Sequence, residues 1–218
     1  MLKIYNAFEQ KISGFIARRN TDKYIKNKIT VSFFSLLLLG ILCGIAVYDA
    51  IYRSQNISSE YLIHHLEETL KNCVTFSDCI SEILSVSKSD IRFLLFIFIS
   101  GFTYFCFPAC GIMVFSKGFL TGFSFFYLIE IYNQFNSTNY SLFFLIFLIS
   151  KLLLSVITVF LAMSSYIFSY RFREIKSSSS VLRRAPITYR YFFIFIYSIG
   201  GALLTNYIYC FLIYHLIK

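Results

Sequence analysis

The clearest signal in this chain is the stretch GFTYFCFPACGIMVFSKGFLTGFS, residues 101–124, where glycines, a proline and a lysine interrupt an apolar run. The interruptions are Gly101, Pro108, Lys117-Gly118 and Gly122-Phe123. Hydrocarbon tolerates glycine, proline and lysine only where neighbouring helices or water satisfy them. The stretch therefore predicts a packed hairpin between two membrane spans, with its turn at Lys117-Gly118.

The composition of the whole chain indicates a membrane protein. The 218 residues are 57% hydrophobic and only 14% charged, and the mean hydropathy is +0.68. A soluble domain of this length needs far more polar surface. We expect an all-α polytopic membrane protein with about five transmembrane helices, over residues 31–52, 91–116, 118–133, 141–168 and 189–217. The third span is shorter than the about 20 residues that cross a bilayer as a helix.

The segments outside these spans complete the predicted organisation. Residues 1–30 form a cytoplasmic amphipathic arm in the membrane interface, which could instead dock a cytoplasmic partner. Residues 53–90 form a small extracytoplasmic helical segment, too short to bury a core alone, so its apolar stripes rest on the membrane, on the spans or on a partner. Residues 91–168 hold spans two to four, and residues 169–188 form a basic cytoplasmic linker before the last span.

Lysine and arginine distribution predicts the orientation. Fourteen of these residues lie in the arm, at the 117 turn and in the 171–190 segment, against five on the other side. The positive-inside rule then places the N-terminus in the cytoplasm and the C-terminus outside. The net charge of +9 suits contact with membrane lipids, and we expect no nucleic-acid partner.

Three ionisable residues lie within or near the predicted spans. Lys151 is deep in the fourth span, whereas Glu130 and Asp49 lie near the outer ends of the third and first spans. We expect an intramembrane ion pair from Lys151 to Glu130 or Asp49 that fixes helix packing; a transport role for the same residues stays open.

The remaining residues offer little for catalysis. The six cysteines lack metal-site spacing, although Cys73 and Cys79 both lie in the outer segment and could form a disulfide. No nucleophile with a base, no phosphate-binding loop and no paired catalytic carboxylates can be assembled. We therefore expect a protein that is not an enzyme, with no catalytic, cofactor-binding or metal-binding residues.

The spacing of Gly101, Pro108, Lys117-Gly118 and Gly122-Phe123 resembles the core signature of the stage II sporulation protein M family, a multi-pass membrane component of the engulfment complex. Chain length, five spans and a basic N-terminal arm extend the likeness. The resemblance implies a non-enzymatic scaffold in a bacterial cytoplasmic membrane. Such a scaffold assembles and localises peptidoglycan-degrading proteins, the sporulation proteins D and P, for septal peptidoglycan remodelling during engulfment in endospore formation. It also implies that Lys117-Gly118 shapes a cytoplasmic hairpin and that Pro108 and Gly122 allow close helix approach.

Two other classes remain open. A membrane transporter or permease subunit would use Lys151, Glu130 and the broken hairpin to line a midplane site. A purely structural or lipid-interacting membrane protein would have no defined partner and would tolerate a change at Pro108.

Overall fold

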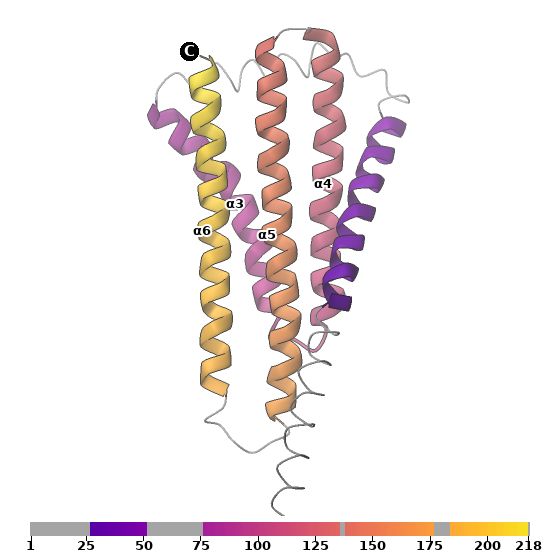
Figure 1. The fold of residues 1–218 in the computed structure, drawn as a ribbon, viewed down its shortest axis with the longest axis vertical. Coiled ribbons are helices and arrows are strands. Elements are labelled where there is room, and N and C mark those ends of the chain that lie inside the picture. Colours follow the sequence, from indigo (N-terminus) through magenta and orange to yellow (C-terminus); the bar gives the residue numbers. More distant parts are fainter. Residues whose placement is uncertain (1–26, 52–75, 136–137, 177–183, 218) are drawn as a thin grey trace, which may run out of the picture.

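Five antiparallel helices make up the described part of the chain in a computed structural model, which covers residues 27–51, 76–135, 138–176 and 184–217 (Figure 1). The helices are Asn27–Ile51, α3 (Phe76–Ser100), α4 (Cys106–Phe135), α5 (Thr138–Lys176) and α6 (Arg184–Ile217). No strand occurs within these ranges. The prediction of an all-α fold is confirmed.

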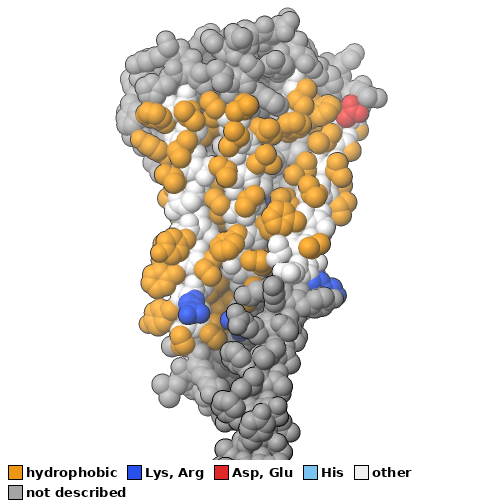
Figure 2. Space-filling view, viewed as in Figure 1, with side chains coloured by type: hydrophobic (Ala, Val, Ile, Leu, Met, Phe, Trp, Pro, Cys, Tyr) orange, Lys and Arg blue, Asp and Glu red, His pale blue; other side chains and the backbone are white. Residues whose placement is uncertain are grey.

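Four of these helices contain a segment that is long and apolar enough to cross a membrane. The segments are Asn27–Ile51, Cys106–Phe126, Leu145–Arg173 and Pro186–Tyr209. Hydrophobic side chains cover most of the described surface on the face shown in Figure 2, with basic side chains near its lower end. A soluble protein could not expose such a surface, whereas a bilayer solvates it. The chain is a polytopic membrane protein.

The fifth helix, α3, differs because only its second half is apolar. It runs obliquely across the bundle and contacts α4, α5 and α6 (Figure 1). Its C-terminal end meets the start of α4 through a tight turn over residues 101–105. Backbone hydrogen bonds close this turn, from Gly101 N to Phe98 O at 3.1 Å and from Thr103 N to Ser100 O at 2.9 Å.

The predicted hairpin position at Lys117-Gly118 is wrong. Both residues lie in the middle of α4, which continues without a break from Cys106 to Phe135. Glycine and lysine are tolerated there because other helices pack against the glycine and neutralise the lysine. With the turn at 101–105, the next span begins at Cys106, so the short span predicted at 118–133 becomes part of a full-length helix.

Pro108 has a local role that the resemblance does not imply. It is the third residue of α4, where a backbone N–H would have no intrahelical acceptor, so the missing donor costs nothing. Its side chain is exposed. The implied close helix approach at Pro108 is therefore not observed.

Close helix approach occurs instead at two pairs of glycines spaced four residues apart. Gly40 and Gly44 of helix Asn27–Ile51 face Gly118 and Gly122 of α4. A Cβ on any of the four would collide with a backbone carbonyl of the opposite helix. The carbonyls belong to Phe115, Phe119, Leu37 and Ile41. This is backbone-to-backbone contact of the kind that Gly-x-x-x-Gly sequences permit in membranes, and it confirms the expectation for Gly122.

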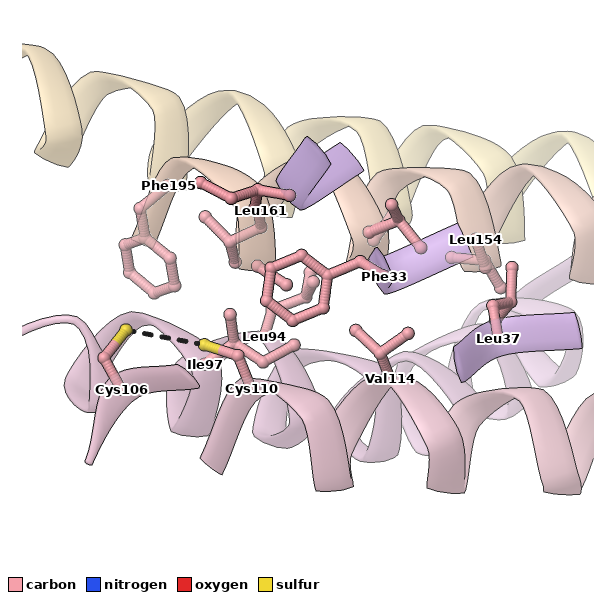
Figure 3. Close-up of a cluster of buried hydrophobic side chains, with 14 residues drawn as sticks. Phe33, Leu37, Leu94, Ile97, Cys106, Cys110, Val114, Leu154, Leu161 and Phe195 are labelled. Atoms are coloured by element: carbon pink, nitrogen blue, oxygen red, sulfur yellow. Dashed lines mark hydrogen bonds between the residues drawn. The ribbon is translucent and has the colours of Figure 1, made fainter. Parts of the chain in front are cut away.

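All five helices contribute to one apolar core (Figure 3). Phe33, Ile97, Val114 and Leu161 are fully buried within it, and each comes from a different helix. Phe195 of α6 lies at its edge and closes the cluster. Because a close-packed interior resists sliding, this core fixes the heights of the helices relative to one another.

Candidate functional site: a buried ion pair between three helices

Asp90 of α3 and Lys117 of α4 form a buried ion pair, with Lys117 Nζ donating to Asp90 Oδ1. Asp90 is 6% exposed and Lys117 is 7% exposed. Burying an ionisable residue inside a membrane protein costs free energy unless the residue is paired. A pair of charged side chains that is this deeply buried therefore marks a candidate site.

Asn206 of α6 completes the partners of the carboxylate. Its Nδ2 donates to Asp90 Oδ2 at 3.1 Å and to Ser87 Oγ at 3.0 Å. Asn206 and Ser87 are also almost fully buried. Both oxygens of Asp90 therefore accept a hydrogen bond, and the cluster joins α3, α4 and α6.

The cation has a second stabilising contact. Lys117 Nζ lies 5.7 Å from the centroid of the Phe93 ring, within the range of cation–π attraction. With the carboxylate on one side and the ring nearby, the ammonium group is shielded from hydrocarbon.

A chain of hydroxyl groups extends this polar layer to α5. Thr121 Oγ1 donates to Lys117 O at 2.8 Å and lies 3.2 Å from Ser155 Oγ, which donates to Lys151 O at 2.8 Å. Such serine and threonine bonds satisfy polar groups that lipid cannot. The layer around Asp90 therefore connects to every long helix from α3 to α6.

The predicted partners of Lys151 remain untested. Its Nζ lies 5.3 Å from the centroid of the Phe147 ring. The side chain of Glu130 falls outside the described residues, and Asp49 lies near the end of helix Asn27–Ile51. An ion pair of Lys151 with Glu130 or Asp49 thus stays a prediction. The ion pair between Asp90 and Lys117 is one that the sequence did not suggest.

A signal for Asp90 and Lys117 was nevertheless present. Asp90 lies ten residues before the end of α3, and Lys117 lies eleven residues after the start of α4. At 1.5 Å per residue these positions lie about 15 Å and 17 Å from the turn, so antiparallel helices bring them to the same level. The pair becomes visible once the turn is placed at 101–105 instead of 117.

A second polar cluster binds the C-terminal end of α3, next to the turn at residues 101–105. Tyr191 OH donates to Phe98 O at 2.7 Å, and Ser165 Oγ donates to Ile97 O at 3.0 Å. Both carbonyls lie in the last turn of α3, where the donor four residues on is missing from the helix. The two side chains add to the local bonds that Gly101 N gives to Phe98 O and Ser100 Oγ gives to Ile97 O. Gly101 lies directly against the Tyr191 hydroxyl, and a Cβ there would collide with it.

Two cysteines lie close to this cluster. Cys106 and Cys110 are buried, with sulfur atoms 3.8 Å apart (Figure 3), and Cys110 Sγ lies 3.0 Å from Ser100 Oγ. No group of three or more potential metal ligands occurs among the residues described. Cys73 and the side chain of Cys79 lie outside those residues, so a disulfide between them stays a prediction.

The last motif residue, Phe123, packs edge-on against Tyr48 of helix Asn27–Ile51, with ring centroids 5.1 Å apart.

A scan against protein-family models, a search of curated proteins and a search of solved structures each found no match to this chain.

Proposed function

We propose that this protein is a non-enzymatic integral membrane scaffold that assembles and localises peptidoglycan-degrading proteins during engulfment in endospore formation. The proposal rests on the resemblance of residues 101–123 to the stage II sporulation protein M signature. One structural observation supports it: most of the signature residues have a packing role. Gly101 lies under Tyr191, Lys117 pairs with Asp90, and Gly118 and Gly122 meet the backbone of the first helix.

These contacts favour a single rigid arrangement. Sliding one helix by a residue would drive side chains into carbonyls at the glycine contact and would separate the buried charges. A bundle with one allowed register presents its connecting segments at fixed separations. That property suits a platform that must hold two enzymes side by side.

We further propose that the upper end of the bundle in Figure 1 faces outward and carries the partner contacts. The first helix, α4 and α6 end there, and α3 and α5 begin there. The basic segments 1–30 and 169–188 adjoin helix ends at the opposite side, which the positive-inside rule assigns to the cytoplasm. In this arrangement residues 53–75, the part of the predicted outer segment that precedes α3, meet sporulation proteins D and P together with the outer turns.

The second candidate is a transporter or permease subunit. The buried Asp90–Lys117 pair favours it, because an intramembrane ionisable residue is a functional hypothesis by default. The two functions make opposite demands on the pair. A scaffold needs it as a permanent contact, whereas a transporter must break it or change its charge during each cycle.

A pull-down from cells entering sporulation tests the scaffold. A tagged copy is extracted in mild detergent, and co-purifying proteins are identified by mass spectrometry for the wild type, Gly122→Leu and Gly200→Leu. Gly200 is the matched control, because a Cβ there meets nothing within 4 Å. Peptidoglycan hydrolases should accompany the wild type and Gly200→Leu, and Gly122→Leu should lose them. Recovery of an ATPase or a solute-binding protein, or of no partner, would contradict the proposal.

A further inference from the structure

A groove lies between α5 and α6 at the end of the bundle where α5 ends and α6 begins. Its volume is about 290 Å³, and its nine lining residues include Arg171 and Arg190 but no acidic residue. Apart from Ser164, the other lining residues are aliphatic or aromatic. The groove therefore combines two cations with an apolar wall, and it is separate from the Asp90 cluster.

We propose that this groove binds an anionic phospholipid, with the phosphate between Arg171 and Arg190 and the start of an acyl chain along the apolar wall. Arg171 is the third residue from the end of the span Leu145–Arg173, and Arg190 is the fifth residue of the span Pro186–Tyr209. Because the two helices are antiparallel, both arginines lie within about one helical turn of the same membrane interface, at headgroup level. Basic pockets between membrane helices bind anionic headgroups, and guanidinium groups suit phosphate.

The apolar wall leads from that level toward the hydrocarbon. Ile167 and Met163 lie about 6 Å and 12 Å deeper than Arg171 along α5, and Ile194 lies about 6 Å deeper than Arg190 along α6. A free phosphate ion would gain nothing from this wall, whereas an acyl chain would cover it. The volume lies near the lower limit of about 300 Å³ for ligand pockets, so the groove holds the phosphate region and the first part of one chain.

Native mass spectrometry of the purified full-length protein tests the proposal. The apparent Kd of the first bound lipid is measured with dioleoyl phosphatidylglycerol and with dioleoyl phosphatidylcholine. At about fivefold for each basic side chain, the two arginines should favour the anionic lipid by about 25-fold. Arg171→Gln with Arg190→Gln should abolish this preference. The matched control, Lys28→Gln with Arg92→Gln, removes two exposed charges outside the groove and should keep it.

A second variant tests the apolar wall with both charges in place. Ile167→Trp should fill the groove and weaken phosphatidylglycerol binding at least fivefold. Three results would overturn the proposal: equal affinity of the wild type for the two lipids, an unchanged preference in the double arginine variant, or wild-type affinity in Ile167→Trp. If the double arginine variant cannot be purified, Ile167→Trp and the wild-type lipid preference decide the question.

Discussion

Removing Lys117 alone should destabilise the bundle far more than removing Lys117 and the charge of Asp90 together. In Lys117→Met, the one donor that Asp90 keeps among the described residues is Asn206, and within that part of the chain its carboxylate is buried without a cation. Exposed ion pairs are worth about 0–1 kcal/mol, but this pair is less than a tenth exposed, so the larger cost of breaking a buried pair applies. We expect a loss of about 3–5 kcal/mol in the free energy of unfolding.

The double variant, Asp90→Asn with Lys117→Met, leaves no buried charge at this site. The side-chain amide introduced at position 90 keeps an oxygen acceptor for Asn206, and the thioether side chain introduced at position 117 fills roughly the space of the lysine stem. Replacing a buried pair by neutral groups of similar volume is often close to neutral, so we expect a cost below about 2 kcal/mol. The two single variants and the double variant form a cycle, whose interaction energy should reach at least about 3 kcal/mol.

Reversible unfolding in mixed detergent micelles, followed by circular dichroism, measures all four free energies. The reasoning fails if the double variant loses as much stability as the sum of the single variants, because the charges would then act independently. It also fails if Lys117→Met costs less than about 1 kcal/mol, the value of an exposed pair.

Three further predictions concern the contacts around α4. Gly118→Leu should lower the free energy of unfolding by more than about 2 kcal/mol, because the new side chain collides with the first helix. Gly200→Leu, the control, should leave the free energy of unfolding unchanged or raise it by up to about 1 kcal/mol. Thermal unfolding in detergent compares the two variants, and equal effects would contradict the close contact. Gly101→Ala should be destabilising, and Tyr191→Phe in the same chain should partly suppress that effect, because it removes the hydroxyl that the new Cβ meets. If the stability changes of the two single variants simply add up to that of the double variant in the same assay, this contact is contradicted. Arg173→Gln should speed amide hydrogen exchange at residues 101–105, because Arg173 Nη2 donates to two carbonyls of that turn. The free energy of global unfolding should change little. Unchanged exchange would show that the arginine does not hold the turn.

Hydropathy predicted the fold class because a membrane span is defined by its own length and apolarity. The same reasoning could not place the hairpin. A lysine with no known partner is expected at the membrane interface, so the pattern predicts a turn at Lys117-Gly118. The sequence does not show which distant residue neutralises that lysine. The actual turn has Gly101 as its only glycine and contains no proline.

The candidate site was missed for a related reason. Asp90 falls within the predicted outer segment 53–90 because it precedes the apolar run, whereas in the structure α3 carries it into the bundle. The glycine contact could have been anticipated from the four-residue spacing in both Gly40–Gly44 and Gly118–Gly122. Which glycine-bearing span meets which other span depends on the assembled bundle, so no local pattern contains that information.

The most direct test of the scaffold is the recovery of peptidoglycan hydrolases with the neutral double variant, Asp90→Asn with Lys117→Met, in cells entering sporulation. If the pair serves packing, this variant should recover the hydrolases as the wild type does and should complete engulfment, whereas Lys117→Met alone should do neither. Loss of hydrolases and engulfment in a double variant that unfolds like the wild type would contradict the account, because the charges themselves would then be required.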